Sequence, residues 1–121
     1  MKLSMFALLA VLLTESVACA ENWPNWRGPR GDGTSLETNL PIEWDATTGK
    51  NIVWKVPVPY GGHSSPAVWG DMVFVTGADE AKPRRMLMAF DRKSGKLLWE
   101  VDVEEAPLEK KHKLNSWASG T

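Results

Sequence analysis

The sequence predicts an all-β chain that holds about one four-stranded antiparallel β-propeller blade plus an extra strand, preceded by a signal peptide. The first observation behind this fold class is an internal repeat: Asp, two residues, Thr or Ser, Gly-Lys, apolar residues and then Trp occur twice. The second is the spacing, because 46 residues separate Gly49 from Gly95 and 45 separate Trp54 from Trp99. This period is typical of propellers whose blades are four-stranded sheets.

The first element is the signal peptide, expected over residues 1–20. Lys2 supplies a positive charge, and residues 5–13 form an apolar run that is too short for a transmembrane helix of ~20 residues. Ala18 and Ala20 place small residues three and one positions before the expected cleavage site. We therefore expect no transmembrane segment and an exported protein, periplasmic or secreted, that begins at Glu21.

Cys19 is the only cysteine, and it leaves an alternative open. Its alanine neighbours suit lipid attachment, although Ser16 stands where a lipoprotein signal usually has leucine. An uncleaved anchor is a further alternative. If the signal is removed before Glu21, the mature chain has no thiol, which excludes disulfide, zinc-thiolate and other thiol chemistry. The formal net charge of −1 gives no indication of a nucleic-acid partner.

The second element is an arm rich in Trp and Gly, expected over residues 21–43. Its loop carries Arg27 and Asp32 among several glycines. One interpretation is a ligand or metal site. The other is structural, with the Arg27 guanidinium stacked on a tryptophan and Asp32 holding a turn. Residues 44–58 follow as a hairpin and a strand that is expected to close the propeller.

The blade itself is expected over residues 63–103. Runs of β-branched, aromatic and other apolar residues between turn signals predict its four strands: 65–69, 72–76, 86–90 and 97–103. The second of these is expected to be fully buried, because its apolar residues are continuous. Residues 77–85 are expected to form a polar loop, since Pro83 cannot occupy a central strand.

The turn between the last two strands has the residues that tight turns require. The Asp91 carboxylate can accept backbone N–H bonds across the turn, and Gly95 can adopt positive φ. Asp45 and Gly49 occupy the matching positions of the first copy. In the fourth strand Trp99 alternates with charged residues, which predicts a partly exposed outer strand.

These segments resemble one repeat of the pyrroloquinoline-quinone (PQQ) propeller family. The resemblance rests on Ser64-Ser-Pro-Ala-Val, Gly70-Asp, Val73-Phe-Val, Met88-Ala-Phe-Asp and the later Ser-Gly-Lys and Leu-Trp. The family includes quinoprotein alcohol dehydrogenases and the propeller lipoprotein of the outer-membrane assembly machine. It implies seven or eight blades, with residues 104–121 leading into a second blade. It also implies that Trp54 and Trp99 dock between blades, so remaining blades or other copies of the chain are the expected partners.

Two functions follow from the resemblance. The first is a non-catalytic module that binds or scaffolds a protein or polymer ligand, with no cofactor. The second is the N-terminal part of a dehydrogenase that uses PQQ and calcium, for which several blades would supply oxygen ligands. No catalytic or metal-ligating residue is predicted in this chain. His63, after a glycine pair near the expected central channel, is the one candidate for contact with a cofactor, and a structural turn residue is the alternative interpretation.

Overall fold

The computed structural model describes residues 20–119, and within β4 it leaves out the side chains of residues 104 and 105. The expected apolar signal run, Ala18 and Cys19 lie outside the described residues. Ala20 is described and directly precedes the arm. Among the described residues no helix is long and apolar enough to cross a membrane.

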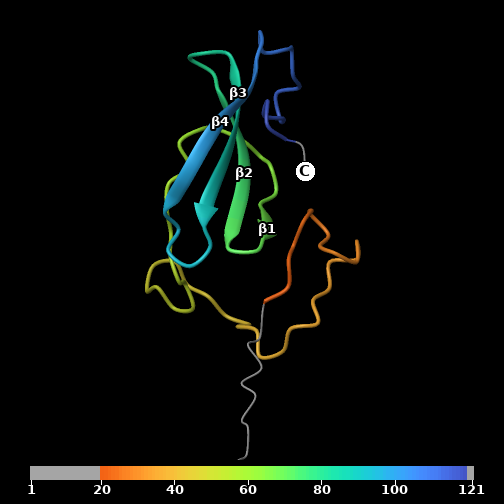
Figure 1. Cartoon of the computed structure of the whole chain (residues 1–121), viewed down its shortest axis with the longest axis vertical. Coiled ribbons are helices and arrows are strands. Elements are labelled where there is room, and N and C mark those ends of the chain that lie inside the picture. The colour runs from red at the N-terminus through yellow and green to blue at the C-terminus, as the bar shows by residue number, and fades with distance from the viewer. Residues whose placement is uncertain (1–19, 120–121) are drawn as a thin grey trace, which may run out of the picture.

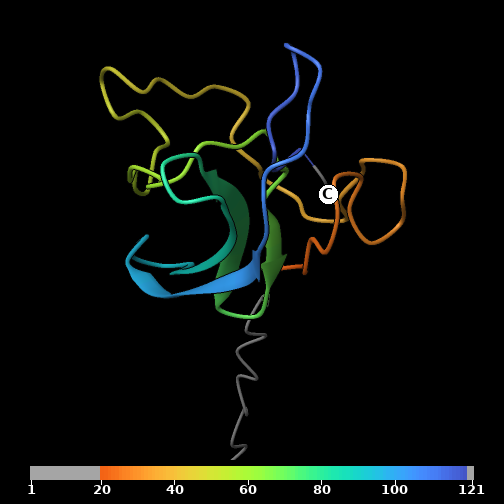
Figure 2. The same ribbon diagram turned by 90° about the horizontal axis from the view of Figure 1, so that it is seen from above.

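A four-stranded antiparallel meander forms the body of the structure (Figure 1). Its strands follow the chain in the order β1-β2-β3-β4. Their bounds are β1 Ala67–Trp69, β2 Met72–Asp79, β3 Arg84–Asp91 and β4 Leu97–Glu105. The four predicted strands are therefore confirmed as one sheet, which has the form of a single propeller blade. The sheet twists from β2 to β4 (Figure 2), as antiparallel sheets do.

The polar loop expected over residues 77–85 is wrong. β2 continues through Asp79, and Asp79 pairs with Arg84, so the turn occupies only residues 80–83. Pro83 lies in that turn and removes no hydrogen bond from the ladder. Gly77 allows the longer strand to pass close to Tyr60, because a Cβ at Gly77 would lie 2.6 Å from the Tyr60 Cβ.

The extra strand expected within residues 44–58 does not form. The structure has an isolated bridge between Asp45 and Lys50, and residues 51–58 belong to no strand. The hairpin turn is therefore present, but no described strand lies beside residues 51–58 to pair with them. Asn51 is an extra residue relative to the second copy of the motif, and it adopts a φ of 56°.

The two faces of the sheet are covered unequally. Ala89 pairs with both Phe74 and Trp99, so these three side chains share one face. The Phe74 and Trp99 rings lie 5.9 Å apart across that small alanine. Met88 points to the opposite face and is fully buried there, close to Tyr60 and Gly77. Residues 54–62 thus cover the Met88 face, whereas the Trp99 face is largely open.

This unequal cover corrects the expectation of a fully buried second strand. Residues 72–76 are half-buried throughout, because a continuous apolar strand needs cover on both faces. The open face includes Trp99, Val101 and Val103, which are 41%, 46% and 63% exposed. We call these three residues the outer-strand stripe.

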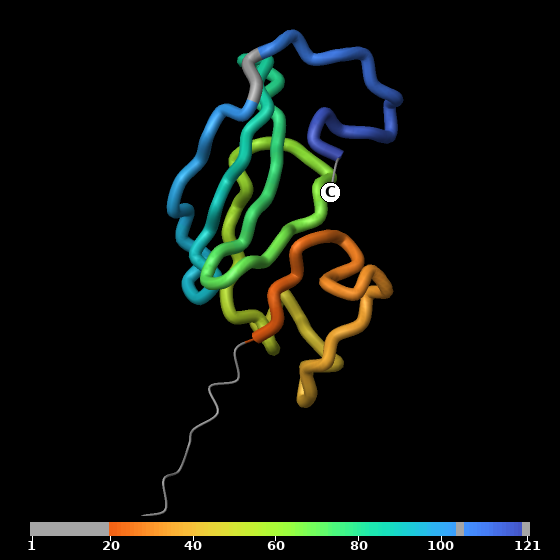
Figure 3. The backbone as a smooth tube through the Cα atoms, turned by 45° about the vertical axis from the view of Figure 1, so that its right-hand side comes forward, coloured from red at the N-terminus to blue at the C-terminus, as the bar shows by residue number. Residues whose placement is uncertain are grey.

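The arm and the C-terminal segment lie near opposite ends of the sheet (Figure 3). The Trp23 N–H and C=O bond to the C=O and N–H of Val68 at 2.8 Å each, which attaches the arm to the free edge of β1. The Asn22 side chain accepts a hydrogen bond from the Gly70 N–H at 2.7 Å. At the other end, the Ala118 C=O accepts a hydrogen bond from the His63 N–H.

Candidate functional site

Trp54 docks on the turn that joins β3 to β4. Its indole N–H donates to the Arg92 carbonyl at 2.9 Å. The ring lies directly over Gly95, where a Cβ would come within 2.6 Å of it. Gly95 also needs its φ of 72° to close the turn. A tryptophan of the first motif therefore packs on the glycine of the second, which agrees with a packing role for Trp54.

In both repeated turns the aspartate carboxylate accepts one hydrogen bond from a main-chain N–H and one from the hydroxyl three residues later. The Asp91 carboxylate accepts from the Ser94 hydroxyl at 2.6 Å and from the Ser94 N–H at 2.7 Å, which lowers the pKa of Asp91 below its usual range. The Asp45 carboxylate accepts from the N–H of Thr47 and the hydroxyl of Thr48. Those bonds likewise lower the pKa of Asp45.

Gly49 and Trp99 are the counterparts of Gly95 and Trp54 in the two motifs, and neither takes part in such a contact. A Cβ at Gly49 would have no described atom within 4 Å, although its φ of 77° matches that of Gly95. Trp99, the counterpart of Trp54, is 41% exposed. Among the described residues, the two repeated motifs thus contain one occupied tryptophan–glycine contact, one open glycine turn and one half-exposed tryptophan.

His63 is exposed and lies four residues before the start of β1. Its main-chain N–H bonds to the Ala118 carbonyl at 2.9 Å and to the Ser116 hydroxyl at 3.0 Å. Ser116 and Ala118 therefore lie beside the segment that leads into β1. Near them lies a small cavity of about 230 Å³, lined in part by Thr76, Val103 and Trp117.

Calcium takes six to eight oxygen ligands. The side chains that the structure describes include no group of three or more His, Cys, Asp or Glu that could hold a metal. Trp54 packs on Gly95 and Trp99 packs beside Phe74, so the two indoles have different partners. The structure does not bring His63 together with either tryptophan.

The arm loop has the structural contacts that its sequence suggests. The Arg27 guanidinium lies over the Trp26 ring, 4.9 Å from the centroid. The Asp32 carboxylate accepts from the Thr34 N–H at 2.9 Å and the Thr34 hydroxyl at 2.7 Å. These bonds lower the pKa of Asp32. Asp32 therefore holds a turn, as in the plainer of the two interpretations.

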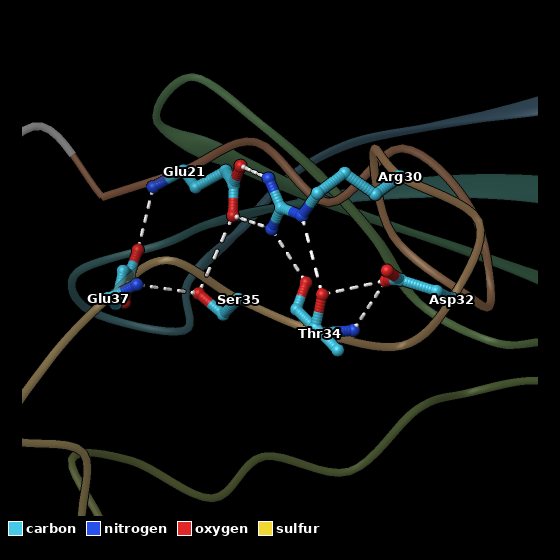
Figure 4. Close-up of polar contacts among 6 residues, drawn as sticks. All are labelled: Glu21, Arg30, Asp32, Thr34, Ser35 and Glu37. Carbon is cyan, nitrogen blue, oxygen red and sulfur yellow. Dashed lines mark hydrogen bonds and ion pairs between the residues drawn. The ribbon is translucent and has the colours of Figure 1, made fainter.

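A polar cluster around Glu21 is not apparent from the sequence (Figure 4). Arg30 donates two hydrogen bonds to the Glu21 carboxylate, at 2.6 and 2.8 Å. Hydrogen bonding to Arg30 is the main reason that the pKa of Glu21 is lowered. Arg30 also donates to the Thr34 carbonyl at 2.6 Å. The Glu21 N–H donates to the Glu37 carboxylate at 2.7 Å. These residues are brought together by the path of a glycine-rich loop, for which the sequence has no periodic signal.

A cavity of about 450 Å³ lies beside this cluster, between the arm and the blade. Its walls include Trp23 and Leu40 from the arm, and Val68 and Arg92 from the blade. Glu21, Gly33, Ser35 and Glu37 complete the lining. The cavity is open and has both apolar and charged walls, so it could admit a small polar group or a side chain.

Comparison with known proteins identifies the chain at the level of the family. No curated protein and no solved structure matches it. A family model for PQQ-type repeats, PQQ_2, described as outer membrane protein assembly factor BamB, matches residues 34–119. The match covers the hairpin, all four strands and the segment that follows β4, which is well over half of the chain. The chain therefore belongs to the PQQ_2 repeat family.

Proposed function

We propose that this chain is the N-terminal part of an exported seven- or eight-bladed propeller that binds or scaffolds another protein and performs no catalysis. The observation that carries the binding role is the match to a family described as an outer membrane protein assembly factor. Signal-peptide cleavage before Glu21 belongs to the same proposal and rests on Ala18 and Ala20. A propeller suits this role because its loops present an extended surface on a rigid scaffold.

The open tryptophan and the open glycine turn support the propeller assembly. Trp54 on Gly95 shows how one repeat motif packs on the next. By the same geometry, Trp99 would pack on the glycine turn of a following repeat. A preceding repeat would place its tryptophan on Gly49. The remaining blades, or other copies of the chain, would thereby cover the outer-strand stripe.

The alternative is part of a quinone- and calcium-dependent dehydrogenase, and a binding measurement separates the two. The exported protein is titrated with PQQ in the presence of calcium, and binding is followed by calorimetry and by the quinone absorbance. A scaffold shows no saturable binding. Saturable binding that is lost when calcium is chelated supports the dehydrogenase and contradicts the proposal.

The binding role has its own test in the cell. A photo-crosslinking residue replaces Glu80 or Lys82 in the exposed β2–β3 turn, and in a matched control it replaces Ile42, which is 91% exposed in the arm. The proposal expects a discrete crosslinked envelope protein from the turn positions and not from Ile42. Equal, diffuse crosslinking from both places would contradict a loop-presented binding surface.

A further inference from the structure

The first residue expected after cleavage lies in the polar cluster of the arm. Figure 4 shows Glu21 between two side chains of opposite charge, Arg30 and Glu37. Arg30 binds the Glu21 side-chain carboxylate through both terminal nitrogens. Glu37 accepts a hydrogen bond from the Glu21 main-chain nitrogen at 2.7 Å. The main-chain nitrogen and the side-chain carboxylate of Glu21 are therefore both hydrogen-bonded to charged side chains.

The charge at the main-chain nitrogen depends on processing. Within an uncleaved chain this nitrogen is a neutral amide, and the side chains of Glu21, Arg30 and Glu37 carry one net negative charge. Cleavage before Glu21 converts the amide into an α-ammonium group, which adds the missing positive charge. A hydrogen bond with one ionised partner is already about twice as strong as one between neutral groups, and after cleavage both partners of this bond are ionised.

The surroundings hold both partners in place. Arg30 is fixed by the Thr34 carbonyl as well as by Glu21. The Glu37 N–H donates to the Ser35 hydroxyl at 3.1 Å. Two residues after Glu21, Trp23 pairs with Val68 of β1. A fixed residue 21 therefore also fixes the start of the segment that attaches the arm to the blade.

We propose that Arg30 and Glu37 form a recognition site for the mature N-terminus, in which Glu37 binds the α-ammonium group of Glu21 and Arg30 binds its carboxylate. The inference rests on the export and cleavage proposed above. Signal removal then has a structural consequence, because it completes an ion pair that holds the arm on the blade. The site selects an N-terminal residue with an acidic side chain.

The test measures how fast the α-amino group reacts. Free α-amino groups have a pKa of about 8, and an acylating reagent attacks only the uncharged amine. Pairing with Glu37 keeps the group protonated, so labelling near pH 7.5 is expected to be about threefold to tenfold slower than in urea. The full chain is exported with its own leader, purified and labelled, and mass spectrometry identifies the N-terminal residue and its labelling rate.

Two matched variants make the result specific. Glu37→Gln keeps an oxygen acceptor but removes the charge, and it is expected to raise the labelling rate to the value seen in urea. Glu43→Gln removes the carboxylate that pairs with Lys50 in the neighbouring hairpin, and it should leave the rate unchanged. If the N-terminus is Glu21 but Glu37→Gln has no effect, the recognition site is refuted while cleavage stands. If the N-terminus is another residue, both are refuted.

Discussion

The contact between Trp54 and Gly95 can be tested by comparing the same substitution in two equivalent turns. Gly95 and Gly49 have φ values of 72° and 77°, so replacing either by alanine forces a side chain into the left-handed region, at a cost of about 1–2 kcal/mol. A Cβ at Gly49 meets no described atom within 4 Å. A Cβ at Gly95 would lie 2.6 Å from the Trp54 ring, so only this substitution displaces the indole.

The loss of the Trp54 indole contacts determines how much more Gly95→Ala destabilises the protein than Gly49→Ala. Trp54 is half-buried, and about 100 Å² of ring surface at ~25 cal/mol per Å² corresponds to about 2.5 kcal/mol. The hydrogen bond to the Arg92 carbonyl contributes about 1 kcal/mol more. Gly95→Ala is therefore expected to lower the free energy of unfolding by up to about 3.5 kcal/mol more than Gly49→Ala.

The assay is urea unfolding at low protein concentration, followed by circular dichroism. A double-mutant cycle isolates the contact. In a Trp54→Ala background the indole is already absent, so Gly95→Ala should cost only what Gly49→Ala costs. Equal costs for Gly95→Ala and Gly49→Ala in the unmodified protein would refute the docking of Trp54 on this turn.

Three further predictions follow from the same contacts. Gly77→Ala should lower the free energy of unfolding by about 1–3 kcal/mol in the same urea assay, because its Cβ would overlap Tyr60. Gly61→Ala is the control: its Cβ would meet no described atom within 4 Å, so it should cost less than half as much. Trp54→Phe keeps a ring over the turn but loses the indole N–H, so it should cost about 1 kcal/mol, and a cost as large as that of Trp54→Ala would contradict this division. Hydrogen bonds from Ser94 lower the pKa of Asp91 in the folded state. The contribution of Asp91 to stability is therefore present above about pH 4 and is lost as the pH falls through the folded pKa. Urea unfolding from pH 6 to pH 2.5 should show this loss of stability, and Asp91→Asn should make the loss smaller.

The blade was predictable from the sequence because its signals are local. Tight turns at Gly70 and at Asp91–Gly95 separate the apolar runs, and those turns fix where each strand begins or ends. The continuation of β2 beyond residue 76 was not predicted, because a glycine and a later proline usually end a strand. β2 continues there because it pairs with β3 as far as Asp79 and Arg84, and Gly77 leaves room for Tyr60, a contact that the neighbouring sequence does not reveal.

The arm cluster was not predictable for a related reason. Glu21 and Arg30 meet because the loop between them turns back on itself, with Gly28 at positive φ. Glycines permit such a path but do not specify which side chains it brings together. The interpretation of Asp32 as a turn residue was correct because its partner, Thr34, is only two positions away.

The central claim is that further repeats cover the outer-strand stripe in the exported protein. The most direct measurement replaces Val101 by cysteine and follows its reaction with a water-soluble thiol reagent in the cell envelope. Ile42→Cys, in the exposed arm, is the control. The account predicts that Val101→Cys reacts at least about tenfold more slowly than Ile42→Cys, because the burial of a face by a packed neighbour excludes the reagent. Equal reaction rates would show that the Trp99 face stays open and would contradict the account.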